Sequence, residues 1–220
     1  MIRVAIVDHG LGNLFSVQRA CETCGIDANI TADRREIQSA QGVILPGVGA
    51  FGDAMATLHK LDLVSPLKDI IAAGTPFFGI CLGVQLLMSE SYEFGLHKGL
   101  NIFEGTVERF DKPMEGSRIL KVPEICWNQV NPADGSHNRW TQTPLETSKA
   151  GEYMYFVHSF FVKPAQKDVV LSTTTYGNVT YCSSVGRENV FACQFHPERS
   201  GAAGLKVYRQ WASLIDKNGN

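Results

Sequence analysis

The stretch "TPFFGICLGVQLLM" (Thr75–Met88) joins a short apolar run to a helix-compatible run, with a cysteine between two glycines at the junction. The run before Gly79 is typical of a buried parallel strand. A chain that turns sharply from a strand into a helix needs a backbone without clashing Cβ atoms. Gly79 and Gly83 supply that backbone on both sides of Cys81. The stretch therefore predicts a strand, a tight turn at Cys81 and a helix.

The same alternation of strand and helix extends over the N-terminal part of the chain. Buried strands are predicted at 2–7, 42–47 and 76–80, and helices at about 14–23, 53–60 and 64–73. This alternation is typical of βαβ units and of a sheet covered on both faces. From about residue 100 the segments are rich in β-formers, and a last helix is expected near 202–215. We therefore expect an α/β fold of the doubly wound, flavodoxin-like type. Its sheet should be mostly parallel with an antiparallel extension, in a single domain over residues 1–220.

The composition is that of a globular protein with one core: of 220 residues, 44% are hydrophobic and 19% charged, and the formal charge is -2. This charge balance offers no basic face, so nucleic-acid binding is not expected. No apolar run approaches the ~20 residues that cross a bilayer, so no membrane span is expected. The N-terminal "MIRVAIVDHG" (1–10) predicts a strand at once, without a charged leader and cleavage site. We therefore expect a cytoplasmic protein.

Six cysteines, at positions 21, 24, 81, 126, 182 and 193, are expected to be free thiols in a reducing compartment, most of them buried. Cys21 and Cys24 form a Cys-x-x-Cys pair, which is one half of a common zinc motif. No second Cys or His pair follows at ligand spacing, so two thiols on one helix face are the better interpretation. We expect neither a metal nor another cofactor.

Cys81 occupies the central position of a Gly-x-nucleophile-x-Gly elbow, with sulfur in place of the serine oxygen. Such a turn presents the nucleophile above the carboxyl ends of the strands, where open α/β sheets bind ligands. It also leaves the backbone amide of Leu82 free to bind an oxyanion. From these residues alone, a catalytic thiol and a buried structural cysteine in a tight turn are equally good interpretations.

A base for this thiol is found in "ACQFHPERSG" (192–201), where His196 and Glu198 flank Pro197. Proline biases the residue before it towards extended geometry. Residues i and i+2 of an extended segment project to the same side, so Glu198 can hold one imidazole nitrogen while the other faces the thiol. A structural histidine is the alternative, but the glycine elbow favours the catalytic interpretation.

These segments, with the glycine-rich loop "ILPGVGAFGDAM" (44–55), resemble the class I, triad-type glutamine amidotransferases over essentially the whole chain. The resemblance implies a Cys81–His196–Glu198 triad that hydrolyses L-glutamine to glutamate and ammonia through a glutamyl thioester. It also implies that backbone amides of Leu82 and of the Val48–Gly49 strand bind the oxyanion. The positions that match oxyanion or substrate contacts are Val48, Gly49, Leu82, Gln85, Glu93 and Ser159.

Within this family the chain most resembles the glutaminase subunits of bacterial histidine biosynthesis. The matching segments are "DHGLGN" (8–13), "PGVGAFGDAM" (46–55), "YFVHS" (155–159) and "FHPERSG" (195–201). Because the glutaminase uses up the chain and no Gly-x-x-x-x-Gly-Lys-Ser/Thr motif is present, the acceptor chemistry is expected on another polypeptide. The resemblance implies a heterodimer with a (β/α)₈ cyclase subunit, which receives the ammonia. Positions that match the docking face are Asn13, Trp127, Tyr155 and Arg199.

Two departures from the family pattern leave the partner open. In "VPEICWNQV" (122–130) the family usually has His or Gln and then Met-Gly, where this chain has Glu124, Ile125 and Cys126. His9 stands where the family usually has Tyr, and the resemblance ties both segments to the partner face. One alternative is a paralogous glutaminase that supplies ammonia for amidino groups on surface sugars. A cysteine hydrolase or peptidase on the same scaffold, and a glutamine-binding regulator without turnover, are further alternatives.

Overall fold

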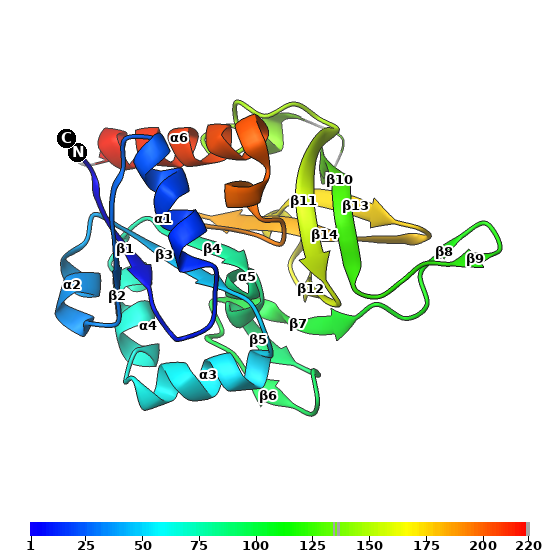
Figure 1. Ribbon diagram of the computed structural model, residues 1–220, viewed down its shortest axis with the longest axis horizontal. Helices are drawn as coiled ribbons and strands as arrows, with labels where there is room; N and C mark the ends of the chain where they lie inside the picture. Colours follow the sequence, from blue (N-terminus) through cyan, green and yellow to red (C-terminus); the bar gives the residue numbers. More distant parts are fainter. Residues whose placement is uncertain (134, 136, 219–220) are drawn as a thin grey trace.

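A large twisted sheet runs through the molecule, and helices cover both faces of its parallel half (Figure 1). The computed structural model describes residues 1–133, 135 and 137–218. The order of the parallel strands is β2-β1-β3-β4-β15. These strands are β1 (Arg3–Val7), β2 (Asp27–Thr31), β3 (Gly42–Gly47), β4 (Phe77–Cys81) and β15 (Val190–Cys193). The predicted doubly wound, mostly parallel sheet is confirmed, and its strand order is of the flavodoxin-like type.

The expected antiparallel extension begins at β15 and continues as β14-β12-β7-β5-β6, with β10, β11 and β13 joined through β14. Only the β5–β7 pair within it is parallel. A separate hairpin, β8–β9, projects from the extension (Figure 1). The bounds are β5 (Met88–Ser91), β6 (His97–Lys98), β7 (Phe103–Arg109), β8 (Met114–Glu115), β9 (Arg118–Ile119), β10 (Glu124–Pro132), β11 (Glu152–His158), β12 (Phe160–Pro164), β13 (Val170–Tyr176) and β14 (Val179–Arg187).

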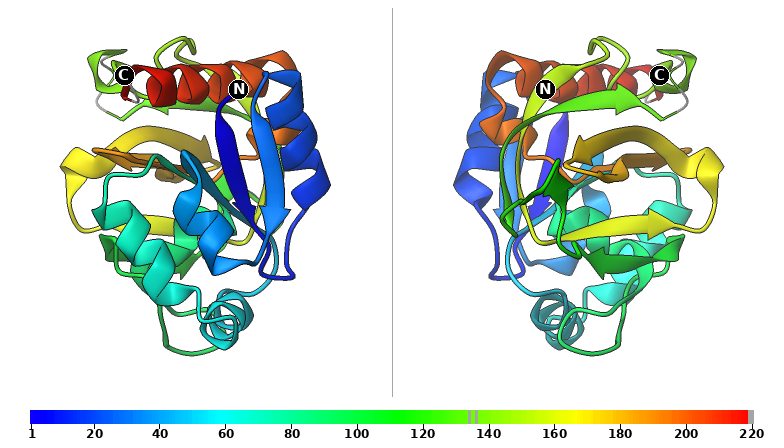
Figure 2. Two further views of the ribbon diagram at one scale, coloured as in Figure 1. Left: turned by 90° about the vertical axis from the view of Figure 1, so that its left-hand side faces the viewer. Right: turned by 90° about the vertical axis from the view of Figure 1, so that its right-hand side faces the viewer.

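Helices lie on both faces of the parallel strands (Figure 2), and two apolar clusters hold them there. Because side chains alternate along a strand, Val4 and Ile6 of β1 face α1 and α6, whereas Ala5 and Val7 face α2, α3 and α4. The helices are α1 (Leu14–Thr23), α2 (Arg34–Ser39), α3 (Phe51–Lys60), α4 (Val64–Ala72), α5 (Leu82–Leu86) and α6 (Gly201–Asn218), with 3₁₀ turns η1 (His137–Trp140), η2 (Lys167–Val169) and η3 (Pro197–Arg199). Burial on both faces explains why these strands are continuous apolar runs.

The structure also bears on the cysteines and on membrane insertion. All six cysteines are free thiols. Within the described part of the chain, no group of three or more His, Cys, Asp or Glu side chains could hold a metal ion. None of the helices that the structure describes is long and apolar enough to span a membrane.

Candidate active site

Cys81 lies at the carboxyl edge of the parallel strands, at the sharp turn from β4 into α5. Its backbone has φ 54°, in the left-handed region that a non-glycine residue occupies at a cost of about 1–3 kcal/mol. A Cβ on Gly83 would overlap the carbonyl oxygen of Leu45, and one on Gly79 would lie 2.9 Å from Cβ of Ala192. The two glycines therefore let α5 pack directly against the neighbouring strands, which fixes the position of the thiol.

His196 and Glu198 follow the neighbouring strand, β15, and lie beside that turn. Nδ1 of His196 is 2.8 Å from Oε1 of Glu198, and both side chains are almost completely buried. The backbone amide of His196 donates to the carbonyl oxygen of Tyr155 at 2.9 Å, which ties the segment to β11. Nε2 of His196 is buried, and the Cys81 thiol is its one neighbouring partner among the described residues. That nitrogen is therefore left for the thiol or a substrate.

Opposing influences set the pKa of His196. Burial lowers this pKa, but the neighbouring Cys81 charge and the Glu198 carboxylate outweigh burial and raise it to about 10. Beside a thiolate, the imidazolium is therefore the stable form at neutral pH. The three side chains form a thiol–imidazole–carboxylate arrangement in which the imidazole can carry the proton.

Gln194 joins the thiol to the cavity wall, and the sequence interpretation did not include it. Its Nε2 lies 3.6 Å from Sγ of Cys81, and its Oε1 lies 3.2 Å from Nε2 of Gln85. Nε2 of Gln85 also donates to the carbonyl oxygen of Phe160 at 2.9 Å. A carbonyl only accepts, so the atom of Gln85 that faces Phe160 must be the nitrogen. The same nitrogen faces the amide of Gln194, so the atom of Gln194 on that side must be the oxygen. Both amide hydrogens of Gln85 are used, and its Oε1 is left as an acceptor.

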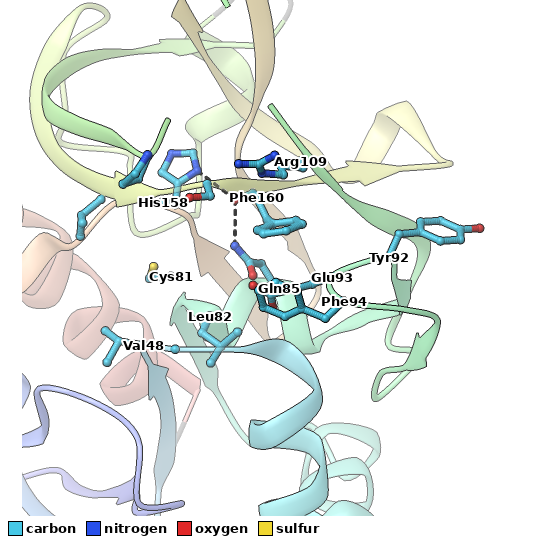
Figure 3. A pocket seen from close by; sticks show the side chains of 14 residues that line it. Val48, Cys81, Leu82, Gln85, Tyr92, Glu93, Phe94, Arg109, His158 and Phe160 are labelled. Carbon is cyan, nitrogen blue, oxygen red and sulfur yellow. Dashed lines mark hydrogen bonds between the residues drawn. The ribbon is translucent and has the colours of Figure 1, made fainter. Parts of the chain in front are cut away.

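A cavity of about 760 Å³ opens above the thiol (Figure 3). Its size is in the range of small-molecule binding sites. Cys81 and all the predicted oxyanion and substrate residues line it, while His196 and Glu198 lie outside its lining. The lining residues are Val48, Gly49, Cys81, Leu82, Gln85, Tyr92, Glu93, Phe94, Arg109, Pro123, Val157, His158, Ser159 and Phe160.

The predicted ligand-contact residues differ in the hydrogen bonds that they already make within the protein. Oε2 of Glu93 accepts from the backbone amide of Phe51 at 2.6 Å, so this carboxylate also caps the start of α3. Gly49, with φ 104°, lies in the loop between β3 and α3, where a peptide can turn its amide toward the cavity. The amide of Leu82 is the first of α5 and has no partner within the helix.

Three of the four predicted docking residues form one row on the surface beside His196. Trp127 and Tyr155 face each other across β10 and β11, with ring centroids 6.1 Å apart. The guanidinium of Arg199 lies 4.8 Å from the centroid of the Tyr155 ring, and that ring lies 6.4 Å from the ring of His196. Asn13, the fourth, is exposed just before α1, which packs against η3.

Two of the residues that depart from the family pattern point inward. Glu124, the first residue of β10, is completely buried: its Oε2 lies 2.9 Å from the hydroxyl of Tyr181, and its Oε1 accepts from Nδ2 of Asn128. His9 is also completely buried, and its Nε2 lies 2.7 Å from the carbonyl oxygen of Pro46, at the base of the glycine-rich loop. Ile125 is exposed beside Trp127. Glu124 and His9 are therefore buried and are not part of the exposed docking surface.

Comparison with known proteins gives the family. Residues 5–211 match the model of the "Glutamine amidotransferase class-I" family. The chain belongs to the class I glutamine amidotransferases. Two relatives are each named "Imidazole glycerol phosphate synthase subunit HisH". The one from Rhodopirellula baltica is 44% identical over 96% of this chain and 97% of its own length. The one from Geobacter metallireducens is 43% identical over 96% of this chain and 98% of its own length.

Solved structures of other amidotransferases share the fold of this class I chain. One, described as "Crystal structure of glutamine amidotransferase", aligns with a TM-score of 0.71 at 17% identity, over 96% of this chain and 98% of that one. Another, "Structure of PurLQS from Thermotoga maritima", aligns with a TM-score of 0.69 at 19% identity over the whole of both chains. The helix-covered sheet and the edge that carries Cys81 thus belong to an established amidotransferase architecture.

Proposed function

We propose that this class I amidotransferase is the glutaminase subunit of an imidazole glycerol phosphate synthase in the cytoplasm. It hydrolyses L-glutamine at Cys81 and passes ammonia to a (β/α)₈ cyclase subunit. The relatives named HisH, similar over nearly their whole length, support the pathway. The observation that carries the chemistry is the placement of the Cys81 thiol, bound by Gln194, in a cavity beside the His196–Glu198 pair.

In the first step the sulfur of Cys81 attacks Cδ of the glutamine side chain. The bond from Cδ to nitrogen breaks while His196 gives its Nε2 proton to that nitrogen, so ammonia leaves and a glutamyl thioester remains. Glu198 holds Nδ1 of the imidazole, which keeps Nε2 directed at the reacting atoms. The negative oxygen of the tetrahedral intermediate is bound by the amides of Leu82 and Gly49. One such donor is worth about 10²–10³ in kcat.

In the second step water hydrolyses the thioester. Nε2 of His196, now without its proton, takes one from the water as the water oxygen attacks the carbonyl carbon. The carbon–sulfur bond breaks, glutamate leaves and the thiolate–imidazolium pair is restored. In sum, glutamine and water give glutamate and ammonia, with no cofactor consumed.

The cyclase subunit docks over the row formed by Trp127, Tyr155 and Arg199. Exposed aromatic and arginine side chains are the residue types that dominate binding energy at protein interfaces. The row adjoins His196, where ammonia is released. A partner seated there would receive ammonia before bulk water protonates it. Asn13 extends the same interface along the start of α1.

The test measures glutamate formed by the purified chain, alone and with the cyclase subunit from the same genome and its nucleotide ligand. We expect strong stimulation by the cyclase, abolished by Cys81→Ala and retained by the matched Cys24→Ala variant. Glutaminase activity that ignores the cyclase would move the chain to another synthase, such as one that makes amidino sugars. Absence of glutamate under all conditions would refute the glutaminase itself.

A further inference from the structure

The carbonyl oxygen of Phe160 fixes the direction of the hydrogen bonds in one wall of the glutamine cavity (Figure 3). It lies 2.9 Å from Nε2 of Gln85 and 2.9 Å from Nδ1 of His158. Because a carbonyl only accepts, both nitrogens must donate to it. Mainly because the ring is buried, the pKa of His158 is lowered to about 3, so the imidazole is neutral. Nδ1 therefore carries the single ring hydrogen, and Nε2 of His158 is an acceptor.

A second carbonyl fixes the neighbouring carboxyl group. Nδ2 of Asn128 donates to the carbonyl oxygen of Thr175 at 2.9 Å, which identifies it as the nitrogen. The same nitrogen donates to Oε1 of Glu124 at 2.9 Å, so Oε1 is an acceptor. Oε2 of Glu124 then faces the hydroxyl of Tyr181 at 2.9 Å and Nε2 of His158 at 3.5 Å.

The hydrogen bonds among Glu124, Tyr181 and His158 can all be made only if the three side chains share one more proton than an ionised Glu124 would leave them. If Glu124 were ionised, its Oε2 and Nε2 of His158 would both be acceptors 3.5 Å apart, with one hydrogen on Tyr181 to serve them. If Oε2 carries a proton, it donates to the oxygen of Tyr181, and the hydroxyl of Tyr181 donates to Nε2 of His158, which lies 3.2 Å away. Every contact is then satisfied. Buried polar groups that lack a partner are costly, so the protonated arrangement is favoured.

The surroundings of Glu124 agree with this count. Burial raises the pKa of Glu124 despite the hydrogen-bond contacts with Asn128, Tyr181 and Cys126, which lower it. Burial and then the Glu124 charge raise the pKa of Cys126 to about 12 and that of Tyr181 well above its ordinary value, so both side chains keep their protons. The titratable groups around Glu124 are Cys126 on β10, His158 on β11, Tyr176 on β13, Tyr181 on β14 and, beyond His158, His196.

We propose that Glu124 is a positioning residue that holds a buried proton and, through Tyr181 and His158, fixes the cavity wall that orients Gln85. The inference rests on the proposed glutaminase function and deepens it. When Glu124 loses this proton, Oε2 and Nε2 of His158 repel each other. His158 then moves from the Phe160 carbonyl, and the wall loses one of the two donors that hold it. Glutamine binding weakens as a result, although the triad is intact.

The kinetic test uses the Glu124→Gln variant, because the side chain of glutamine has the same hydrogen-bonding pattern as a protonated glutamic acid. In Glu124→Gln the side-chain amide donates to Tyr181 and the side-chain carbonyl accepts from Asn128, so the network keeps its pattern. In Glu124→Leu it is lost. We expect the wild-type kcat/KM to fall, through a rise in KM, as the pH rises through the raised pKa of Glu124. Glu124→Gln should lack this step and stay within about threefold of wild type at neutral pH.

Two outcomes of the kinetic test would overturn the proposal. One is a fall in kcat/KM with rising pH that persists unchanged in Glu124→Gln. The other is a Glu124→Gln variant as impaired at neutral pH as Glu124→Leu, in which we expect KM to rise about tenfold or more at every pH. Rescue by the Gln variant alone separates a proton-holding role from simple filling of space.

A test without catalysis separates failure of this inference from failure of the proposed function. ¹⁵N spectra of histidine-labelled protein should show His158 with its hydrogen on Nδ1 at neutral pH in wild type and in Glu124→Gln. Because the folded pKa of Glu124 is raised, its proton stabilises the fold below the unfolded pKa of about 4.3, and this stabilisation is lost as pH rises through the folded pKa. The Tm of wild type relative to Glu124→Gln should therefore fall with rising pH. A hydrogen on Nε2, or a constant difference in Tm, would refute the inference even if the protein were an active glutaminase.

Discussion

Nδ1 of His196 lies 2.8 Å from Oε1 of Glu198, although a single proline separates the two residues along the chain. His196 has extended backbone torsions, φ -102° and ψ 91°, and Pro197 begins the η3 turn that brings Glu198 back under the ring. The base and its orienting carboxylate are thus set by local geometry. The thiol comes from β4, more than a hundred residues earlier in the sequence.

Replacing Glu198 by Gln should shift the pH dependence of catalysis downward. Burial lowers the pKa of His196, and the Cys81 charge and Glu198 together raise it to about 10. Without the carboxylate this pKa falls, so His196 loses the proton that ammonia departure needs at a lower pH. The alkaline limb of kcat/KM should move down, and kcat should drop by about 10²–10⁴-fold. A pH–rate profile of Glu198→Gln against the exposed Glu188→Gln checks this, and an unmoved alkaline limb would contradict it.

Local backbone chemistry made the position of the thiol predictable from sequence. Gly79 and Gly83 around Cys81 predicted the strand–turn–helix unit, and the left-handed φ of 54° at Cys81 is the turn that they accommodate. The helix predicted at 14–23 is α1 with the same bounds, and the strand predicted at 42–47 is β3. These segments have one fully apolar face or two, so their burial is visible in the sequence pattern.

Elements at the edge and contacts over long range were not predictable in the same way. The sequence prediction omitted β2 (Asp27–Thr31), an edge strand that pairs only with β1 and therefore mixes polar and apolar residues. The last helix runs from Gly201 to Asn218, beyond the predicted 202–215. Gln194 contacts Cys81 across 113 residues and Gln85 across 109, and no local pattern marks a pair of that separation.

Adding a methyl group at Gly83 should destabilise the fold severely. The new Cβ would overlap the carbonyl oxygen of Leu45, and backbone on both sides leaves neither atom free to yield. We expect Gly83→Ala to unfold at much lower denaturant concentration than wild type, or to be insoluble. Gly74→Ala is the control, because Gly74 has φ 86° and open space around it. It should cost only about 1 kcal/mol for the strained backbone. Equal midpoints of chemical denaturation for the two variants would disprove the close-approach argument.

Removing the ring nitrogens of His9 should loosen the glycine-rich loop above Cys81. Nε2 of His9 must donate to the carbonyl oxygen of Pro46, 2.7 Å away, because a carbonyl cannot donate. His9→Phe leaves that buried carbonyl unpaired, at a cost of about 1–3 kcal/mol in the free energy of unfolding. Gly49, whose amide binds the oxyanion, lies three residues beyond Pro46, so a looser loop should affect the transition state more than substrate binding. We therefore expect a larger change in kcat than in KM. The control is His59→Phe, at the exposed end of α3. If His9→Phe has the stability and kcat of wild type, the hydrogen bond between His9 and Pro46 does not position the loop.

Truncating Trp127 should weaken binding of the cyclase subunit. The indole is 51% exposed in the isolated chain and stacks edge-on against Tyr155, which in turn carries the guanidinium of Arg199. Tryptophan at the centre of an interface commonly contributes 2 kcal/mol or more, and 1.4 kcal/mol is a tenfold change in Kd, so Trp127→Ala should raise Kd about 30-fold. Calorimetric titration with the cyclase subunit measures this. Leu61→Ala removes an apolar side chain that is 39% exposed just beyond α3, outside the row, and should leave Kd unchanged. If both variants bind like wild type, the cyclase docks elsewhere, and the release of ammonia beside His196 needs another route to the acceptor.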